Sequence, residues 1–139
     1  ELTVEQATAQ SIKAWIVAHP ERRQELFNVN PSFIFFREER LPDPSVGPKG
    51  ALGVPLTPAR SVAIDPSFLP LGAPIWLATT EASSEVPMRR LVMGQDTGGA
   101  ITGAARADLF TGWGSWGDPA YQLASRLKQP LQMWVLWPR

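Results

Sequence analysis

The chain has 139 residues, which suits one domain with one hydrophobic core, because domains commonly have about 100–150 residues. Thirteen basic and thirteen acidic side chains give a net charge of zero, and neither sign forms a run, so nucleic acid is not favoured as a partner. The absence of cysteine excludes disulfides and thiolate chemistry, and a single histidine, His19, argues against a multi-histidine metal site and against a serine hydrolase. No run approaches the roughly 20 apolar residues that cross a bilayer, so no transmembrane segment is predicted.

The first thirty residues are predicted to be helical. Thr3 and Gln6 have the spacing of a capping box, and Pro20 ends the first helix because proline disfavours helical backbone at the preceding residue. A second, short helix is predicted over residues 21–27. Apolar residues at helical spacing predict one buried face for the first helix. They are Val4, Ala7, Ile12, Trp15 and Ile16.

Strand-forming segments follow, and they are separated by proline, glycine and aspartate at short intervals. This rhythm predicts a small β-barrel. Prolines and glycines recur from Leu41 to Pro58, which predicts a long ordered loop there. One late helix is predicted over residues 119–128, with Asp118 as N-cap and Pro119 as its first residue. The predicted strands are residues 33–36, 61–64, 75–80, 91–94, 101–105 and 132–137.

Three aspartates stand beside apolar or small residues at predicted strand and turn edges: Asp65, Asp96 and Asp108. Carboxyl groups in such places are often partly buried, and burial or a neighbouring like charge can convert one into a proton donor. The alternative interpretation is structural, since Asp65 before proline is a common turn opener and Asp96 before Thr-Gly-Gly can cap a tight turn. On the residues alone, both interpretations remain open.

Glycine and tryptophan form the other notable patterns. Gly98-Gly99 and the glycines of residues 112–117 lack the spacing of a phosphate loop or a dinucleotide fingerprint, so turns are predicted there. Trp113 and Trp116 lie in the glycine-rich connection, where an exposed ring could stack on a sugar. The other tryptophans have apolar neighbours and are predicted to pack in the core or between helix and barrel: Trp15, Trp76, Trp134 and Trp137.

Six motifs occur in a fixed order along the chain. They are Asn30-Pro-Ser-Phe-Ile-Phe-Phe-Arg, Lys49-Gly-Ala-Leu-Gly-Val-Pro-Leu, Arg60-Ser-Val-Ala-Ile-Asp-Pro, Pro70-Leu-Gly-Ala-Pro, Gln95-Asp-Thr-Gly-Gly-Ala-Ile and Arg106-Ala-Asp-Leu-Phe. In this order and spacing, the chain resembles the C-terminal part of the membrane-bound lytic transglycosylase A family, including its three-aspartate (3D) domain. The opening helix, with His19-Pro20-Glu21, resembles the segment that precedes this domain.

The resemblance implies a mainly β fold with flanking helices. Residues 1–29 would form a helical segment that packs on a six-stranded double-psi β-barrel of residues 30–139. The implied activity is cleavage of the β-1,4 bond between N-acetylmuramic acid and N-acetylglucosamine in peptidoglycan, with a 1,6-anhydro ring in the product. No metal or organic cofactor is implied. The implied location is the periplasmic face of the outer membrane, and no signal or lipid attachment site is expected within these residues.

Matched motif by motif, Asp108 corresponds to the family's proposed acid and base, and Asp96 and Asp65 correspond to supporting carboxylates. The resemblance implies glycan contacts along Gly98, Gly99 and Ala100, and Trp113 adds a ring for stacking. Many relatives have a basic residue where Thr102 stands. The family's earlier segment and its inserted second domain, which forms the other wall of the glycan groove, are expected to be missing, so weak activity is expected from this chain alone.

Two other functions remain open. The same barrel could be a peptidoglycan-binding module without catalysis, since a fold does not determine a function. An aspartic-protease-like dyad is suggested by Asp96-Thr-Gly, but that class pairs two such aspartates, and neither Asp65 nor Asp108 repeats the motif. The products formed from glycan strands would separate these functions.

Overall fold

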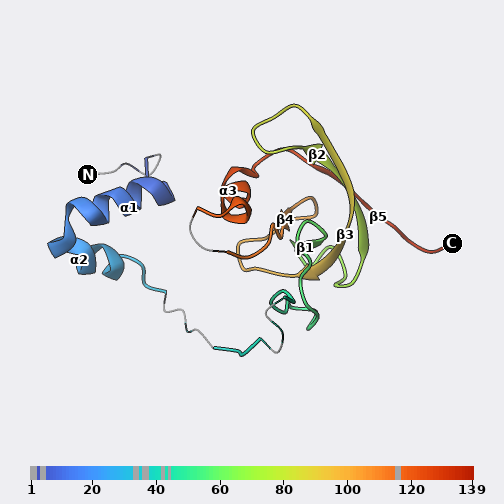
Figure 1. The fold of residues 1–139 in the computed structure, drawn as a ribbon, viewed down its shortest axis with the longest axis horizontal. Helices are drawn as coiled ribbons and strands as arrows, with labels where there is room; N and C mark the ends of the chain where they lie inside the picture. Colours follow the sequence, from blue (N-terminus) through green and yellow to red (C-terminus); the bar gives the residue numbers. More distant parts are fainter. Residues whose placement is uncertain are drawn as a thin grey trace. The chain divides into compact units, whose positions relative to one another are not determined.

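A computed structural model describes residues 3, 6–32, 35, 38–41, 43, 45–114 and 117–139. The chain forms two compact units, Glu1–Glu39 and Arg40–Arg139 (Figure 1). The first unit is helical, and the second contains the sheet. None of the described helices is both long and apolar enough to cross a membrane.

Helix α1 spans Ala9–Ala18 and begins later than predicted. The Thr8 side chain accepts from the Ser11 backbone N–H (3.1 Å), and the Ser11 hydroxyl accepts from the Thr8 N–H (2.9 Å), which is a complete capping box. The predicted start at Thr3 is therefore wrong, because the hydrogen bonds between Thr3 and Gln6 close a separate turn before the helix. The predicted end before Pro20 is confirmed.

The turn after α1 is a 3₁₀-helix, Pro20–Arg22, and it leads into α2, Arg23–Asn28, close to the predicted second helix. No residue of α1 or α2 is buried, so the predicted buried face of the first helix is wrong. Trp15 instead stacks on His19 with 4.7 Å between ring centroids, and the Arg22 guanidinium lies 5.3 Å from the Trp15 ring. A unit this small has too little apolar surface to build a closed core.

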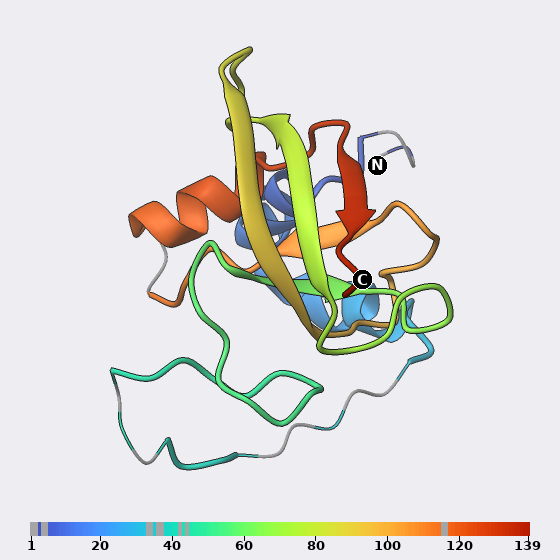
Figure 2. The ribbon, with the colours of Figure 1, turned by 90° about the vertical axis from the view of Figure 1, so that its right-hand side faces the viewer.

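The second unit is built on a five-stranded sheet with the order β4-β1-β3-β2-β5. Strands β1 and β3 are parallel, and every other pair is antiparallel. Figure 2 shows β2 and β3 side by side, with β5 along the other edge of β2. The strands are β1 Ser61–Ile64, β2 Pro74–Thr80, β3 Pro87–Asp96, β4 Ala107–Leu109 and β5 Gln132–Val135.

The core lies on one face of this sheet. Strand alternation turns Val62 and Ile64 of β1 to that face, and both are completely buried. Helix α3, Pro119–Arg126, follows the N-cap Asp118 and has Pro119 as its first residue, as predicted. The buried core cluster comprises Val62, Ile64, Ile75, Leu77, Met88 and Val92.

The mainly β class is confirmed, but a closed six-stranded double-psi barrel is not. In the part of the chain that the structure describes, the strands form one open sheet with β4 and β5 at its edges. Residues 33, 34 and 36 of the first predicted strand lie outside the described residues, and Phe35 is not in a strand. The predicted strand at 101–105 is wrong, because Gly103 has a φ of +104° and donates its N–H to Asp65 instead of a neighbouring strand.

The core assignment of three tryptophans is also wrong. Trp76, Trp134 and Trp137 are 39%, 49% and 77% exposed. Trp76 alternates with the buried Ile75 and Leu77, so it points to the opposite face of the sheet, where Trp134 is its direct partner on β5. The apolar neighbours that suggested burial therefore belong to the other face. Trp116 lies outside the described residues.

Candidate functional site

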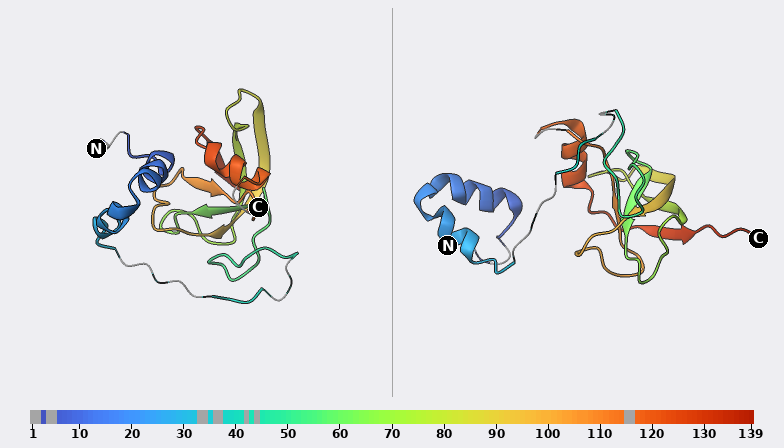
Figure 3. Two further views of the ribbon diagram at one scale, coloured as in Figure 1. Left: turned by 60° about the vertical axis from the view of Figure 1, so that its left-hand side comes forward. Right: turned by 90° about the horizontal axis from the view of Figure 1, so that it is seen from below.

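Strand β1 brings two of the three aspartates into one row. Its residue Ala63 pairs with Asp96 of β3 on one side and with Asp108 of β4 on the other. Figure 3 shows β1 and β4 side by side. Paired residues on adjacent strands point to the same face of a sheet, and Ala63 points away from the core that Val62 and Ile64 enter. Asp96 and Asp108 therefore share the face opposite the core. Two strand spacings separate their Cα atoms, which is about 10 Å.

A β-bulge puts Asp96 in this row. Val62 pairs with Gly94, but the next residue, Ala63, pairs with Asp96, so Gln95 is an extra residue on β3. Gly94 faces the core, because a Cβ added there would lie 2.7 Å from Ile64 Cδ1. Without the bulge, Asp96, two residues later, would face the core as well. The bulge is held by a hydrogen bond from the buried Ser61 hydroxyl to the Gln95 side chain.

Asp96 is held by a loop that lies far away in sequence. The Ala51 N–H donates to Asp96 Oδ1 (2.9 Å), and the Leu52 N–H donates to the Gln95 carbonyl oxygen (3.1 Å). At Gly50, an added Cβ would lie only 2.4 Å from the Gln95 carbonyl oxygen, so only glycine fits. The motif that begins at Lys49 marked this loop, but the residues alone did not indicate its contact with Asp96.

Asp65 follows β1 directly and is buried, with 8% of its surface exposed. Its Oδ2 accepts from the Gly103 N–H (2.7 Å), and its Oδ1 accepts from the Ser67 N–H (2.9 Å). These backbone hydrogen bonds, Gly103 first, lower the pKa of the Asp65 carboxyl below its ordinary value. Asp65 is therefore an ionised carboxylate whose two oxygens fasten the loop 97–106 to the end of β1.

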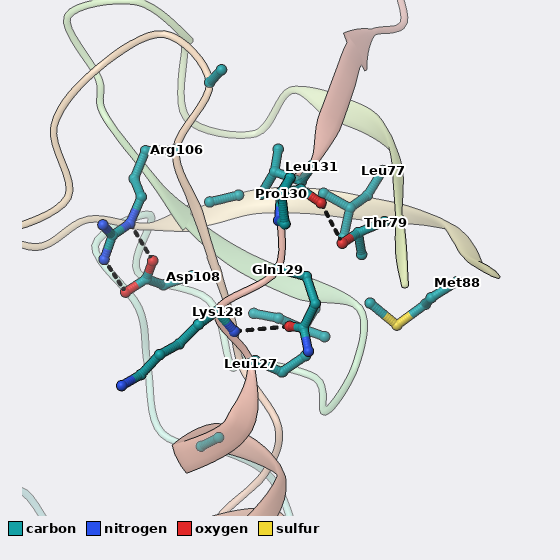
Figure 4. A pocket seen from close by; sticks show the side chains of 14 residues that line it. Leu77, Thr79, Met88, Arg106, Asp108, Leu127, Lys128, Gln129, Pro130 and Leu131 are labelled. Atoms are coloured by element: carbon teal, nitrogen blue, oxygen red, sulfur yellow. Dashed lines mark hydrogen bonds and ion pairs between the residues drawn. The ribbon is translucent and has the colours of Figure 1, made fainter. Parts of the chain in front are cut away.

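Asp108 has a different environment. Its side chain is 49% exposed and forms a two-pronged ion pair with Arg106: Nε lies 2.6 Å from Oδ1, and Nη2 lies 3.2 Å from Oδ2 (Figure 4). This contact raises the pKa of the Arg106 guanidinium, chiefly through the hydrogen bond and then through the opposite charge. Asp108 is thus a carboxylate that a ligand can reach.

A cavity of about 550 Å³ adjoins Asp108. In Figure 4, Asp108 and Arg106 lie on one side of it, and Leu77, Thr79 and Met88 lie on the other. Helix α3 and the segment after it, which includes Lys128, complete the wall. Leu77 and Met88 belong to the core cluster, so the cavity lies on the core face of the sheet, and Asp108, whose strand position faces the other way, lies at its edge. Neither Asp65 nor Asp96 lines this cavity.

The predicted glycan contacts lie on exposed backbone. Gly98, Gly99 and Ala100 belong to a turn in which the Ile101 N–H donates to the Gly98 carbonyl oxygen (2.8 Å). An added Cβ at Gly99 would meet nothing within 4 Å. Trp113 is half-exposed and stacks on Phe110 with 6.1 Å between ring centroids.

The arrangement offers proton transfer at one carboxyl group. Among the described residues, Asp65 has both oxygens bonded to backbone and Asp96 has one, whereas the contact recorded for the Asp108 carboxylate is with the Arg106 side chain. Among the described residues, no group of three histidine, aspartate or glutamate side chains is placed to hold a metal ion.

Comparison with known families gives two matches. Residues 60–137 match the family model described as "3D domain", and residues 1–37 match the model described as "MltA specific insert domain". The second match corrects the expectation that the inserted domain is wholly missing, because the opening residues correspond to part of it.

A curated relative agrees with these matches. The membrane-bound lytic murein transglycosylase A of Vibrio cholerae is 38% identical over 116 residues, which cover 79% of this chain and 30% of that protein. The chain therefore spans about a third of the length of this curated relative.

Solved structures agree with this relationship. The lytic transglycosylase LtgG of Burkholderia pseudomallei is 51% identical, with a TM-score of 0.66, and the match covers 99% of this chain and 40% of that chain. MltA of Neisseria gonorrhoeae is 42% identical with a TM-score of 0.80, and the match covers 99% of this chain and 34% of that chain. A structure of Escherichia coli MltA with bound chitohexaose is 32% identical with a TM-score of 0.70, and the match covers 91% of this chain and 37% of that chain.

The family model for the 3D domain covers more than half of the chain, and its match lies on the unit that carries the three aspartates. The match of the opening residues to the insert domain and the names of the relatives agree with it. The chain therefore belongs to the membrane-bound lytic transglycosylase A family, and its residues 60–137 are the three-aspartate (3D) domain.

Proposed function

We propose that this chain carries the catalytic carboxyl groups of a peptidoglycan lytic transglycosylase. The observation that carries the proposal is Asp108, a half-exposed carboxylate in one row with Asp96 on the face of the sheet opposite the core, in a chain of this family. An acid that protonates a bound strand must reach solvent-accessible space, and of the three aspartates Asp108 fulfils this best.

The reaction needs one carboxyl group that acts twice. Protonated Asp108 gives its proton to the glycosidic oxygen, the bond from that oxygen to C1 of N-acetylmuramic acid breaks, and positive charge develops at C1. The C6 hydroxyl of the same sugar then attacks C1, and its proton passes to the Asp108 carboxylate. Asp108 is regenerated, no water is consumed, and the product ends in a 1,6-anhydro ring.

The other predicted site residues would support this reaction. Asp96, fixed by the Ala51 N–H, would contribute a negative charge on the same face of the sheet, near the developing positive charge. Asp65 would hold the loop of Gly98, Gly99 and Ala100 through the Gly103 N–H, so that the exposed backbone of this loop can contact the glycan. Trp113 would offer its exposed ring to a sugar face.

The substrate and location follow the relatives. A relative binds chitohexaose, a β-1,4-linked sugar chain, and others are named membrane-bound, so we propose peptidoglycan strands at the periplasmic face of the outer membrane. We further propose that the open edges at β4 and β5 are completed in the whole protein into a double-psi barrel, with the rest of the glycan groove. No metal or organic cofactor takes part in the proposed steps.

Mass spectrometry of products from purified peptidoglycan strands tests this function, with Asp108→Asn as the control. Anhydro-muramic ends that disappear in Asp108→Asn would support both the reaction and its acid. Reducing ends would mean that water attacks, and the enzyme would then be a hydrolase.

The runner-up is a glycan-binding module without catalysis. The exposed tryptophans Trp76 and Trp134, directly opposite each other on β2 and β5, favour it as a second candidate, because flat exposed rings bind sugars. Retained binding to peptidoglycan without any product would support this alternative and would contradict the transglycosylase.

A further inference from the structure

The face of the sheet opposite the core carries an exposed apolar row besides the two aspartates. Trp76 of β2 pairs with Leu91 of β3 on one side and with Trp134 of β5 on the other, so the three side chains point to one face. They are 39%, 42% and 49% exposed, respectively. This tryptophan row, Leu91, Trp76 and Trp134, therefore presents two indole rings to solvent on neighbouring strands.

The tryptophan row is separate from the row of the two aspartates. From Ala63, at the centre of the aspartate row, two residues along β1 lead to Ser61, and Ser61 pairs with Met93 of β3. Two further residues along β3 lead to Leu91 of the tryptophan row. Four residue steps along the strands correspond to about 13 Å. A ligand on the tryptophan row therefore occupies a site of its own.

A hollow of about 760 Å³ adjoins the tryptophan row near the turn between β2 and β3. Ala78 lines it and pairs with Arg89 of β3 and Gln132 of β5, which line it as well. These three residues lie two positions along the strands from the tryptophan row and on the same face. The short alanine side chain leaves space between the two longer polar side chains. Further polar residues of the lining come from the turn: Ser83, Ser84 and Glu85.

The chemistry of this surface suits a sugar chain that carries carboxylate groups. The flat apolar faces of the two indole rings can stack on sugar rings. The Gln132 amide, the serine hydroxyls and the Glu85 carboxylate can form hydrogen bonds with sugar hydroxyl and acetamido groups. Arg89 can hold a carboxylate with two parallel hydrogen bonds. An apolar protein surface would leave these polar groups without partners, which costs free energy, so a glycan fits the site better.

We propose that the tryptophan row and its hollow form a second glycan-binding site, which takes a β-1,4-linked amino-sugar strand and places a carboxylate of that strand on Arg89. The site takes no part in bond cleavage and holds the chain on the polymer. It is compatible with cleavage at Asp108, because the two rows are separate. That the strand is peptidoglycan rests on the proposed function, whereas the binding of an amino-sugar strand does not.

Chitohexaose, titrated into the chain and followed by ¹H–¹⁵N NMR, tests the site. Each indole N–H gives its own signal, and Trp76→Ala and Trp134→Ala assign the two signals of the row. We expect both signals to shift in the wild type. In either variant, the affinity measured at the remaining signal should fall about tenfold, the upper end for one ring contact. Trp137→Ala is the matched control, since Trp137 is 77% exposed but lies beyond β5 and outside the row.

Trp137→Ala should bind chitohexaose as the wild type does. Indole signals of Trp76 and Trp134 that stay in place up to millimolar chitohexaose would overturn the proposal, and this outcome needs no variant to fold. An equal loss of affinity in Trp137→Ala would overturn it as well, because any exposed tryptophan would then serve.

Three strands of equal length test the contact with Arg89. Chitohexaose has no carboxylate, peptidoglycan strands stripped of their peptides have the lactyl carboxylate of muramic acid, and intact strands have the carboxylates of the stem peptides. Binding is measured in the Asp108→Asn chain, so that the strands are not cleaved. At least one carboxylate-bearing strand should bind about tenfold tighter than chitohexaose, and the one that does identifies the source of the carboxylate.

Arg89→Gln, added to this chain, should abolish the preference for carboxylate-bearing strands. Arg90→Gln is the matched control and should keep the preference, because Arg90 points to the other face and lies 3.9 Å from the Glu81 carboxylate. Equal binding of all three strands, or an undiminished preference in Arg89→Gln, would overturn the contact with Arg89.

Analysis of the products separates this site from the proposed function. Shifted signals of Trp76 and Trp134 in a chain that forms no anhydro product would support the second site and contradict the transglycosylase. Anhydro product formed by a chain whose two indole signals do not shift with glycan would contradict the second site alone.

Discussion

Asp65 and Asp108 lie around the same short strand, yet their surroundings are opposite. Asp65 is buried and receives hydrogen bonds from the backbone of Gly103 and Ser67, whereas Asp108 is half-exposed and is held by the Arg106 side chain. Backbone donors are rigid and always present, but an arginine side chain can move away. The difference teaches that a carboxylate serves structure when backbone amides hold it and remains available for chemistry when a side chain holds it.

The largest expected effect is on turnover. Asp108→Asn should lower the rate of anhydro product formation at least about a hundredfold, the usual contribution of a positioned acid and base. Its melting temperature should stay close to that of the wild type, because the side chain is half-exposed. Product formation by mass spectrometry and thermal unfolding by circular dichroism measure the two effects. Full turnover in Asp108→Asn would remove this aspartate from the chemistry.

The second-largest effect is expected on the stability of the chain, through the loop that holds Asp96. Gly50→Ala should destabilise the chain by about 1–3 kcal/mol, because the added methyl group overlaps the Gln95 carbonyl oxygen and forces the backbone to move. Gly99→Ala is the matched control, since its methyl group meets open space. Denaturant unfolding measures both variants. Equal stability of the two would mean that the contact between this loop and the bulge is not tight in solution.

Asp65→Asn should affect stability more than chemistry. An asparagine side chain has one acceptor oxygen, so it cannot accept from both Gly103 and Ser67, and one of these two part-buried hydrogen bonds is lost. The melting temperature should fall below that of Asp108→Asn, and amide hydrogen exchange in the loop 97–106 should become faster. If Asp108→Asn were the less stable variant, the structural role assigned to Asp65 rather than Asp108 would be wrong.

The smallest expected effect is the pH dependence of the difference in stability between the wild type and Asp65→Asn. The pKa of Asp65 is lowered in the folded chain from an ordinary value of 3.8. Its contribution to stability is therefore complete above that ordinary value and is lost as the pH falls through the folded value. The stability gap between wild type and Asp65→Asn should be constant above about pH 5 and should shrink at lower pH. A gap that widens in acid would contradict this sign.

Much of the secondary structure was predictable from local patterns. Strand β1 was predicted over the residues where it occurs, and α3 starts at the predicted N-cap and proline, because alternation and capping chemistry depend on near neighbours. The strand predicted at 101–105 was wrong because a distant carboxylate, Asp65, takes the Gly103 N–H. The start of α1 was wrong because two capping boxes competed within ten residues, and the complete one is at Thr8.

The candidate site was predictable only in part. The motifs identified Asp65, Asp96 and Asp108, and the family matches agree with the motifs. The roles of Gln95 and Gly50 gave no signal in the residues, since a bulge and a close approach exist only between segments paired in space. The exposure of Trp76 and Trp134 likewise depends on which face of the sheet the core covers.

By itself, the sequence determined the places of β1, β2, β3 and β5, the helix boundaries at prolines, the family and the identity of the three aspartates, because these depend on residue type and local order; it missed β4. Only the tertiary structure decided that Ala63 joins Asp96 and Asp108 in one row, that Asp65 is held by backbone, and that Arg106 and a cavity adjoin Asp108. The physical reason is that strand register, a one-residue bulge and burial set the direction and surroundings of each carboxylate. Those surroundings decide whether a carboxylate can exchange a proton.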